Sequence, residues 1–479
     1  METSIFLSEL IKLKNFRNIE ISSIHSDSRE VKKGSIFFAI RGNKLDGNDF
    51  ISVALDKGAS LVVSDTDHTD QPNVIYFREL KQYIGIFASR FFDNPSENLK
   101  TVCVTGTNGK TTSVETFASM CNLLGYRCAY MSTINFSRDG SCLEESSLTT
   151  PDPIKINKNM AEALEHKSKF ISMEASSHGL EQDRLKGLNI EYAILTSFSH
   201  DHLDYHGDIE SYQSAKEKLF YNLDPKKNVI CIDSPFGEKL YLDLLKNNPD
   251  TYSVSINKDA DFYASFEESS LGLKVHLKAL DKKLTFEIRT ISRYLASNLI
   301  CSMAVLILEK IDLFEISNIT KEIEMPLGRM EKIMKEDHVI YIDYAHTPEA
   351  LESTLKEIKS NHEEPLWCLF GCGGDRDKDK RSLMGNVAEK YSDYITLTSD
   401  NPRNEVEIDI INDILSGVEK ADKIRVNLDR KKAIELTFAE IKKNMKSGVL
   451  LIAGKGHEEY QEINGLFHDL SDRDIVNSL

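Results

Sequence analysis

The sequence has no apolar run long enough to cross a membrane, no closely paired cysteines and no excess of basic residues. A spanning helix needs about 18 or more consecutive apolar residues, and no run approaches that length. The start of the chain lacks a basic n-region, so we expect no signal peptide. The formal charge of −17 argues against a nucleic-acid-binding protein, whose surface would be basic. We therefore expect a cytoplasmic protein that does not insert into membranes.

The cysteines are scattered along the chain, and none belongs to a C-x-x-C pair. This spacing favours reduced thiols in a cytosolic core over a zinc site or disulfide bonds. The positions are Cys103, Cys121, Cys128, Cys142, Cys231, Cys301, Cys368 and Cys372.

With 479 residues the chain is too long for one ordinary core, and it shows no internal repeat or low-complexity segment. A hydrophobic content of 41% and a charged content of 28% are those of a globular protein. The motifs divide the chain into three expected domains, residues 1–97, 98–325 and 326–479. The first alternates short apolar runs with Gly and Asp turns, which predicts a small α/β domain.

The most informative segment runs from Val102 to Thr112. An apolar run that predicts a buried strand stops at Gly106, and apolar residues then recur at helical spacing from 114 to 124. Strand, glycine turn, Lys-Thr and helix form the geometry that holds a polyphosphate, with Lys110 neutralising charge and Thr111 reaching Mg²⁺. The match is incomplete, because Val104 stands where the long form of the motif has Gly. In this context nucleotide binding is favoured over a structural loop.

Polar reactive groups follow apolar runs at six places in the second and third blocks. Each run predicts a buried strand, and in open α/β sheets ligands bind outside the carboxyl ends of the strands. We therefore predict an α/β fold with two doubly wound sheets that face a shared cleft. The junctions are Phe170–Met173 before Glu174–His178, Tyr192–Leu195 before His200–Asp204, Val339–Ile342 before Asp343–Pro348, Leu366–Phe370 before Gly371–Arg376, Tyr394–Leu397 before Ser399–Arg403, and Val449–Ile452 before Gly454–Glu458.

Several residues in the second block have both a structural and a functional interpretation. Glu174 is either a salt-bridged structural residue or a Mg²⁺ ligand beside the phosphate-binding loop. His200-Asp201-His202 is either a capped loop with solvated side chains or a metal site, with His202 as ligand and Asp201 behind it. Spacing alone does not decide. By composition Lys216, on a helical stretch, is an ordinary exposed lysine.

In the third block, the charge run around Arg376 is either a solvated loop or a source of cations for phosphate or carboxylate. Asp400-Asn401-Pro402-Arg403 is a turn that presents an acceptor and a planar donor fork, which suits a ligand with both amine and carboxylate. An ATP site, a metal site and a zwitterion pocket together point to activation of a carboxylate by phosphoryl transfer, followed by attack of an amine.

The motifs together resemble those of the Mur ligase family. The resemblance extends from about residue 26 to residue 473 and rests on Thr105–Thr112, Met173–His178, Asp201–Gly207, Asp343–Pro348, Phe370–Asp377 and Gly454–Gln461. It implies an N-terminal domain for the UDP end of the substrate, a central ATPase domain with a parallel or mixed sheet, and a C-terminal Rossmann-like domain. It also implies an ADP-forming ligase of peptidoglycan synthesis, and hence of cell shape and division, with ATP and UDP-N-acetylmuramoyl-L-alanyl-D-glutamate as substrates. We expect a monomer.

The resemblance assigns roles residue by residue. Lys110, Glu174, His202 and Lys216 match catalytic positions, and Thr111, Glu174, His202 and Lys216 match Mg²⁺ ligands, Lys216 as the lysine that the family carbamylates with CO₂. The UDP-substrate positions are Ser28, the loop Gly42–Gly47, Thr149, Thr150, Ser177 and Arg184. The ATP positions are Gly106, Thr107, Asn108, Gly109, Lys110, Thr111, Thr112, Asn298, Arg329 and Asp343.

In the family, Asp-Asn-Pro-Arg marks enzymes that add meso-diaminopimelate, whose second carboxylate Arg403 would grip. The implied diamino-acid-binding residues are Arg376, Asp400, Asn401, Pro402, Arg403, Gly454 and Glu458. The sequence departs from the family pattern at Ser197, Leu295 and Asp379. The last change leaves room for meso-lanthionine, and lysine or ornithine are further alternatives. A folylpolyglutamate-type ligase and a non-enzymatic ATP-binding switch are the other classes of function considered.

Overall fold

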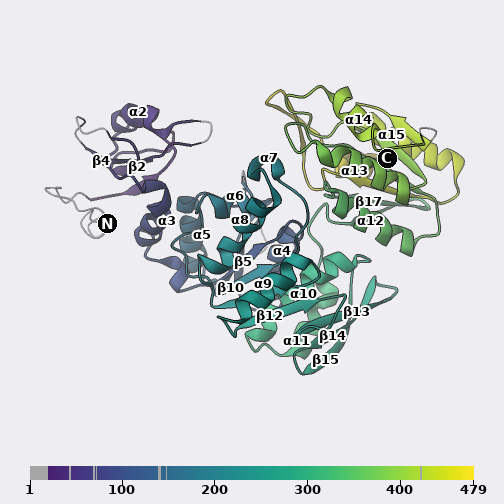
Figure 1. Cartoon of the computed structure of the whole chain (residues 1–479), viewed down its shortest axis with the longest axis horizontal. Coiled ribbons are helices and arrows are strands. Elements are labelled where there is room, and N and C mark those ends of the chain that lie inside the picture. Colours follow the sequence, from purple (N-terminus) through teal and green to yellow (C-terminus); the bar gives the residue numbers. More distant parts are fainter. Residues whose placement is uncertain are drawn as a thin grey trace. The chain divides into compact units, whose positions relative to one another are not determined.

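The computed structural model describes residues 20–42, 45–67, 71, 73–138, 142–146, 148–420 and 423–479 (Figure 1). They fall into two compact units. The first unit comprises the described residues of Met1–Thr105, Cys121–Ile194 and Ser214–Asn228, and the second those of Gly106–Met120, Leu195–Gln213 and Val229–Leu479. Among the described residues no helix is long and apolar enough to span a bilayer.

The first unit begins with a four-stranded parallel sheet in the order β1-β2-β3-β4. Its side chains alternate between two cores: Ile36 and Phe38 of β2 pack toward α3, whereas Phe37 and Ala39 pack toward α2. This alternation confirms the small α/β fold predicted from the apolar runs. The elements are β1 (Ser23–His25), β2 (Ser35–Ala39), α2 (Ile51–Asp56), β3 (Leu61–Ser64), β4 (Val74–Tyr76) and α3 (Leu80–Phe91).

A second set of strands in this unit has the order β10-β5-β9-β6-β7-β8, and β5, β9 and β6 run parallel. The strands β7 and β8 are antiparallel additions. Asp152 caps α5 by accepting from two backbone N–H groups, and Pro153 begins the helix. The elements are β5 (Lys100–Thr105), β6 (Cys128–Met131), β7 (Asn135–Ser137), β8 (Cys142–Glu145), α5 (Pro153–Glu165), β9 (Phe170–Glu174), α6 (Ser177–Glu181), β10 (Tyr192–Leu195) and, shared with the second unit, α8 (Ile209–Tyr221).

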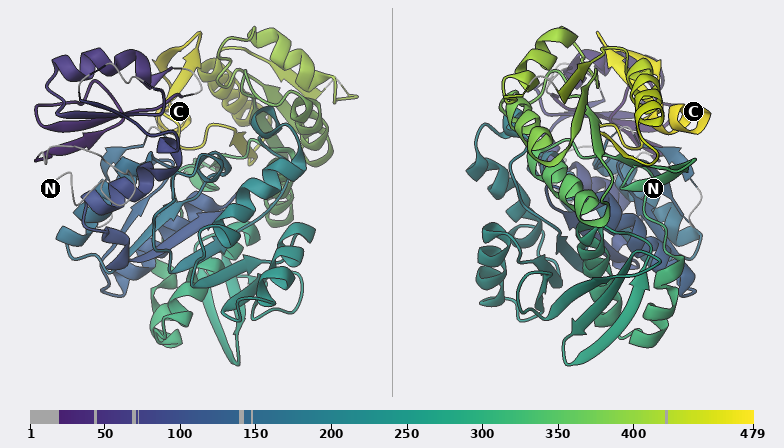
Figure 2. Two further views of the ribbon diagram at one scale, coloured as in Figure 1. Left: turned by 60° about the vertical axis from the view of Figure 1, so that its left-hand side comes forward. Right: turned by 90° about the vertical axis from the view of Figure 1, so that its right-hand side faces the viewer.

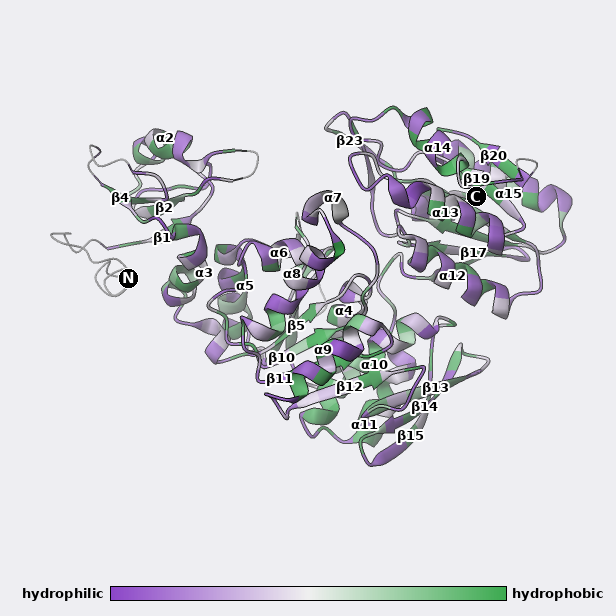
Figure 3. Ribbon diagram, viewed as in Figure 1, coloured by the Kyte–Doolittle hydropathy of each residue, from purple (hydrophilic) through white to green (hydrophobic). Residues whose placement is uncertain are grey.

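The second unit carries the helix that follows the phosphate-binding loop and a sheet in the order β15-β14-β13-β12-β11. The strands β13, β14 and β15 form the long antiparallel ribbon visible in Figure 2. Hydrophobic colour gathers on α10 in Figure 3, in keeping with the burial of α10 on most sides. The elements are α4 (Lys110–Leu123), α7 (Leu203–His206), β11 (Lys227–Cys231), α9 (Pro235–Leu245), β12 (Thr251–Ser255), β13 (Phe262–Glu268), β14 (Leu273–Ala279), β15 (Lys282–Ile288), α10 (Arg293–Leu308) and α11 (Leu313–Ile319).

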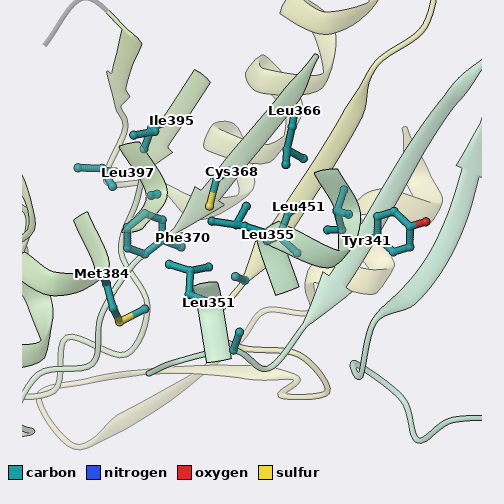
Figure 4. Close-up of a cluster of buried hydrophobic side chains, with 14 of the residues drawn as sticks. Tyr341, Leu351, Leu355, Leu366, Cys368, Phe370, Met384, Ile395, Leu397 and Leu451 are labelled. Atoms are coloured by element: carbon teal, nitrogen blue, oxygen red, sulfur yellow. The ribbon is translucent and has the colours of Figure 1, made fainter. Parts of the chain in front are cut away.

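The C-terminal sheet has the order β16-β17-β21-β18-β19-β20, parallel except for the edge strand β16. Alternate residues of β18 point into two cores: Leu366, Cys368 and Phe370 pack with α12, α13 and α14 (Figure 4), and Trp367 and Leu369 pack with α15 and α16. Helices therefore cover both faces, which is the Rossmann-like architecture expected. The elements are β16 (Glu331–Lys335), β17 (His338–Asp343), α12 (Pro348–Asn361), β18 (Leu366–Phe370), α13 (Asp379–Tyr391), β19 (Tyr394–Leu397), α14 (Glu407–Leu415), β20 (Ile424–Val426), α15 (Arg430–Asn444), β21 (Val449–Ala453), β22 (Tyr460–Ile463), β23 (Leu466–Asp469) and α16 (Asp472–Ser478).

The structure confirms that all six apolar runs before reactive groups are strands, with ends within one residue of those predicted. The predicted helix after the phosphate-binding loop is α4, and Val114, Phe117 and Ala118 on its apolar stripe are buried. Seven cysteines are buried free thiols, as expected, whereas the side chain of Cys142 lies outside the described residues.

An ion pair with no solvent exposure connects the last two helices of the C-terminal sheet. Arg430 of α15 donates through Nε and Nη2 to the two carboxylate oxygens of Asp472 at 2.8 and 2.7 Å, and Nη2 also donates to the carbonyl of Ala453 at 3.0 Å. Its Nη1 lies 3.5 Å from the carbonyl of Ser399. Ala453 is the last residue of β21 and Ser399 lies two residues after β19, so the pair is bonded to the backbone at the ends of two strands.

We expect Arg430→Met to lower the free energy of unfolding by about 3–5 kcal/mol, because it leaves the Asp472 carboxylate buried without its cation. Urea titration followed by circular dichroism measures the loss. The double variant Arg430→Met/Asp472→Leu is expected to regain much of it, since no unpaired charge then remains buried. A single variant as stable as the wild type would contradict this interpretation.

Candidate active site at the strand ends

The phosphate-binding loop, Gly106–Thr112, connects β5 to α4 and is folded around its lysine. Lys110 begins α4, and its Nζ donates to the carbonyls of Gly106 at 2.9 Å and Thr107 at 3.0 Å. The side chains of Thr111 and Thr112 are buried in the first turn of the helix. A helix N-terminus with a lysine held over it is a site for anionic phosphate oxygens.

The segment after β10 fixes the shape of this loop. Ser197 Oγ lies 3.0 Å from both the amide nitrogen and the carbonyl oxygen of Asn108, and the Thr107 amide donates to the Ser197 carbonyl at 3.0 Å. The hydroxyl of Tyr212 donates to Thr107 Oγ1 at 3.1 Å. Ser197, one of the departures from the family pattern, thus contacts the phosphate-binding loop directly.

Two glycines of the loop cannot be replaced without strain. Gly106 has φ +153° and a Cβ there would lie 2.0 Å from Thr196 Oγ1. Gly109 has φ +87° and a Cβ would lie 2.3 Å from Asn298 Oδ1. Asn298, a predicted ATP residue on α10, is therefore packed against the loop backbone.

Two other predicted ATP residues, Arg329 and Asp343, lie near the start of the C-terminal sheet. Arg329 Nη2 lies 3.4 Å from Thr111 Oγ1, and its guanidinium lies 4.4 Å from the centre of the Tyr344 ring.

Asp343 ends β17 and accepts from the amides of Met330 and Ala345. Burial raises the pKa of Asp343. Thr347 caps α12, which begins at Pro348, so this motif also starts a helix.

Asp201 is buried between two histidines, which rules out the interpretation as a loop with solvated side chains for this residue. Its Oδ2 lies 3.5 Å from His202 Nε2 and 3.9 Å from His346 Nε2, while His200 is exposed. Burial raises the pKa of Asp201, but attraction to His202, His346 and Lys380 outweighs it and holds the pKa below its ordinary value. His202 has φ +55°, a backbone conformation uncommon for a residue with a side chain.

In the first unit, the predicted substrate residues gather at the carboxyl end of β9. Glu174, the last residue of this strand, is 1% exposed and accepts from the amide and hydroxyl of Thr133 at 2.7 and 3.0 Å. Thr150 Oγ1 donates to the carbonyl of Glu174 at 2.8 Å, and Arg184 Nη1 donates to the carbonyl of Thr150. The other members of the cluster are Thr149 and Ser177. The hydroxyl of Thr149 lies 3.3 Å from that of Thr133, and Ser177 is buried at the start of α6.

A cavity of about 550 Å³ in the first unit lies between the small sheet and the start of α5. Asp27 and Arg29 line it, on either side of the predicted UDP-substrate residue Ser28, which is itself buried. Of the predicted loop Gly42–Gly47, residues 43 and 44 lie outside the described residues.

The composition-based interpretation of Lys216 is wrong. Its side chain is 1% exposed, on the buried face of α8. A buried cation is costly unless it is paired or chemically altered. No cluster of three or more His, Cys, Asp or Glu side chains is placed to hold a metal among the described residues.

The Asp400–Arg403 loop follows β19 and is bound tightly to the end of β21. Asn401 Nδ2 donates to Glu458 Oε2 at 2.8 Å, and Lys455 Nζ donates to Asn401 Oδ1 at 3.1 Å and to Glu458 Oε2 at 2.9 Å. Lys455 is fully buried. Gly454 has φ +108°, and a Cβ there would lie 2.6 Å from Asp400 Oδ2. The structure thus brings Asp400, Asn401, Gly454 and Glu458 together, as expected.

The side chains of two arginines lie close to Gly373 in the loop after β18. A Cβ on this glycine would lie 2.9 Å from Arg403 Nη1 and 3.6 Å from Arg376 Cγ. Arg376 is exposed, in keeping with a solvated loop, but Arg381 of the same charge run is fully buried. Arg381 donates to both oxygens of Glu405 and to the carbonyl of Gly373, and this contact lowers the pKa of Glu405 to about 2. Sequence reasoning missed both Arg381 and Lys455.

The segment that enters the C-terminal sheet passes directly against the loop after β21. Gly328 has φ +65°, and a Cβ there would lie 2.2 Å from the carbonyl carbon of Gly456. Gly456 has φ +51°, and a Cβ there would lie 2.8 Å from the carbonyl oxygen of Gly328. The two backbones touch because both residues lack side chains.

His457, in the same loop, makes stability depend on pH. Burial, followed by the charges of Arg329 and Lys455, lowers the pKa of His457 to about 3. Between pH 6.5 and pH 3 the imidazole of His457 is protonated in the unfolded chain but stays neutral in the folded chain. The free energy of unfolding therefore falls by about 1.4 kcal/mol for each pH unit by which the pH is lowered.

We expect His457→Gln to remove this part of the pH dependence. Urea titrations of the variant and the wild type at pH 7.5 and pH 5.5 measure it, and the wild type should lose more stability than the variant between the two. His346, whose pKa burial and Lys380 lower to about 4, remains in both proteins and cancels in the comparison. Equal losses would contradict the prediction.

These features define an α/β enzyme that pairs a phosphate-binding loop with a Rossmann-like sheet whose loops hold a hydrogen-bonded cluster of cations and carboxylates. Three family models match the chain: Mur ligase family, catalytic domain over residues 20–89; Mur ligase middle domain over 104–306; and Mur ligase, glutamate ligase domain over 328–456. The chain belongs to the Mur ligase family.

The UDP-N-acetylmuramoyl-L-alanyl-D-glutamate--2,6-diaminopimelate ligase of Haemophilus influenzae (strain 86-028NP) is 38% identical over 491 residues, which cover 98% of each chain. A solved structure with the same name has a TM-score of 0.71 and 32% identity, and the match covers 99% of this chain and 98% of that one. Folylpolyglutamate synthase of Mycobacterium tuberculosis, complexed with ADP and AMPPCP, has a TM-score of 0.64 at 16% identity and covers 77% of this chain and 91% of its own. This last likeness concerns the fold alone.

Proposed function

We propose that this chain is the ATP-dependent ligase that joins meso-diaminopimelate to the γ-carboxylate of UDP-N-acetylmuramoyl-L-alanyl-D-glutamate, with release of ADP and phosphate. The observation that carries the proposal is the cluster in the loops after β18, β19 and β21, where Arg403 lies against Gly373 and Asn401 donates to Glu458, with Arg376 exposed nearby. Cations beside carboxylates suit an amino acid with an additional carboxylate. The full-length likeness to a ligase of this name supports the same substrates. The enzyme acts in the cytoplasm in peptidoglycan synthesis, as a monomer of three domains, 1–97, 98–325 and 326–479.

The reaction proceeds in two displacements. An oxygen of the γ-carboxylate attacks the γ-phosphorus of ATP, the bond to the bridging oxygen breaks, and ADP leaves. The neutral amine of diaminopimelate then attacks the acyl carbon, loses a proton, and phosphate departs with the electrons of the broken C–O bond. Lys110 and the amides at the start of α4 bind the phosphates, with Arg329 close to Thr111. The protein's part is chiefly positioning and electrostatic stabilisation.

The chain offers oxygen donors that fit Mg²⁺. The hydroxyl of Thr111 and the carboxylate of Glu174 are buried, and Mg²⁺ favours a few such oxygens together with phosphate and water. We assign both as ligands, with His202 and a carbamate on Lys216. Magnesium would neutralise charge on the transferred phosphoryl group. The carbamate is proposed from the match of Lys216 to the lysine that the Mur ligase family carbamylates, and its side chain lies buried on α8.

The remaining predicted residues bind substrates. Asn298, packed against Gly109, contacts adenine, and Arg329 and Asp343 contact the phosphates and ribose. Ser28 and the cavity beside it receive the uridine nucleotide. The cluster at the end of β9 holds the muramoyl-dipeptide; its members are Thr149, Thr150, Ser177 and Arg184.

Phosphate release, with product mass as a second readout, tests the proposal. The enzyme is supplied with ATP, Mg²⁺ and UDP-N-acetylmuramoyl-L-alanyl-D-glutamate, and then with meso-diaminopimelate, L-lysine, L-ornithine or meso-lanthionine. We expect the highest kcat/KM with meso-diaminopimelate. A preference for another diamino acid would correct the substrate. Turnover of a folate with glutamate, or no ADP release with any acceptor, would instead favour a folylpolyglutamate-type ligase or an ATP-binding switch.

A further inference from the structure

A β-hairpin that begins within the Gly454–Gln461 motif and extends beyond it holds the Asp400–Arg403 loop in place. Its strands β22 and β23 pair antiparallel and are joined at Asn464 and Gly465, which have φ +51° and φ +75°. Asn-Gly with positive φ at both positions is a turn that fits the twist of a two-stranded ribbon. The hairpin is therefore a locally specified element whose position relative to the loop is set by its contacts.

The hairpin binds the backbone of Arg403 from both sides. The Arg403 amide donates to the carbonyl of Glu462 at 3.0 Å, and the Asn464 amide donates to the carbonyl of Arg403 at 2.8 Å. Arg403 itself has φ +53°, which is uncommon for a residue with a side chain. These bonds hold the arginine in a conformation that the isolated loop would rarely adopt.

The side chain of Glu462 also contacts the guanidinium group of Arg403. Its Oε2 accepts from Arg403 Nε at 2.9 Å, and Arg403 Nη1 donates to the carbonyl of Gly374 at 2.9 Å. With two of its three nitrogens engaged, the planar guanidinium has one orientation. The side chains of Arg403 and Glu462 are 18% and 24% exposed, so solvent screens the pair only in part.

Glu462 also holds the side chain of Asn401 in place, through its backbone amide. The Glu462 amide donates to Asn401 Oδ1 at 3.0 Å, which also accepts from Lys455 Nζ, and Gln461 Nε2 donates to the carbonyl of Asp400 at 2.7 Å. The side-chain oxygen of Asn401 thus accepts two hydrogen bonds from groups of the protein itself. The contact with Asn401 comes from the Glu462 backbone and is kept in any Glu462 variant, so the Glu462 side chain acts through Arg403.

We infer that Glu462 is a positioning residue that sets the selectivity for an amino acid with a second carboxylate, by fixing the Arg403 guanidinium that receives it. The inference rests on the proposed function. A fixed fork binds a carboxylate with two parallel hydrogen bonds and little loss of side-chain entropy, whereas a mobile arginine gives less discrimination.

The test compares Glu462→Ala, Glu462→Gln and the control Glu459→Gln, an exposed glutamate three residues earlier in the chain. Steady-state kinetics are measured with meso-diaminopimelate and with L-lysine. For Glu462→Ala we expect KM for meso-diaminopimelate to rise about tenfold or more, and its preference over lysine to fall by a similar factor. The kcat and the KM for ATP should stay within about twofold, because the phosphate-binding loop is untouched.

Glu462→Gln keeps an oxygen that can accept from Arg403 Nε, so it should remain within about threefold of the wild type. Glu459→Gln should match the wild type. The double variant Arg403→Ala/Glu462→Ala should have the KM of Arg403→Ala alone, since a residue that acts through Arg403 has nothing left to position.

Wild-type turnover of meso-diaminopimelate is measured first, and its absence would contradict the proposed function itself. If the wild type is active, three outcomes overturn the role of Glu462: an unchanged KM in Glu462→Ala, equal losses with both amino acids, or additive losses in the double variant. Thermal unfolding of each variant shows whether it is folded, and a destabilised but selective enzyme would also count against the inference.

Discussion

Replacing Lys110 with alanine is expected to lower the rate of ligation by about 10³-fold. Lys110 begins α4, and its ammonium lies within 3.0 Å of the loop carbonyls of Gly106 and Thr107, where we propose that phosphate oxygens bind. Phosphoryl transfer offers little covalent chemistry to the protein, and charge stabilisation by such a cation supplies much of the rate.

The measurement is phosphate release at saturating concentrations of all three substrates. The exposed Lys239 on α9 provides the control, and Lys239→Ala should keep the wild-type rate. A Lys110→Ala enzyme that forms the amide bond at an undiminished rate would refute the assignment of the ATP site and the acyl-phosphate route with it.

Arg403→Ala is expected to lower kcat/KM for meso-diaminopimelate by about 10²-fold or more. The variant removes a cation held by Glu462 and the Gly374 carbonyl and leaves the Glu462 carboxylate without its partner. Arg403 is expected to bind the second carboxylate of meso-diaminopimelate, and L-lysine has no such carboxylate. The variant should therefore change kcat/KM for L-lysine far less than kcat/KM for meso-diaminopimelate.

Competition assays with equal concentrations of the two amino acids give the selectivity directly from product masses. Arg425→Ala, on the outer strand β20, is the matched control because that arginine is half-exposed. Should Arg403→Ala retain the wild-type preference for meso-diaminopimelate, another residue must recognise the second carboxylate, and Arg376 would be the first to test.

The positions of the strand-end loops could be predicted because each buried strand is an apolar run that stops abruptly at Gly, Asp, His or Ser. The residue spacing in the phosphate-binding loop was equally informative, since glycine, lysine and threonine each have a geometric task there. Such signals are local in sequence. The structure accordingly agrees with the sequence on β5, β9, β10, β17, β18, β19 and β21.

The buried charges could not be predicted from local patterns. Arg381, Arg430, Lys455 and Lys216 are each at most 1% exposed, yet charged residues in a helix or loop are ordinarily solvated. Arg430 and Asp472 are 42 residues apart in sequence, and Arg403 and Glu462 are 59 apart. Their pairing depends on how strands are ordered in the sheet, which composition and periodicity do not encode. The resemblance to a family supplied a role for Lys216 that its own surroundings in sequence could not.

The contact between Gly328 and Gly456 limits how this enzyme can evolve. Neither glycine can acquire even a methyl group while the other backbone stays in place. A Cβ on Gly328 would lie 2.2 Å from the carbonyl carbon of Gly456, and a Cβ on Gly456 would lie 2.8 Å from the carbonyl oxygen of Gly328. A saturation library scored by growth should therefore find both positions intolerant, although neither carries a reactive group.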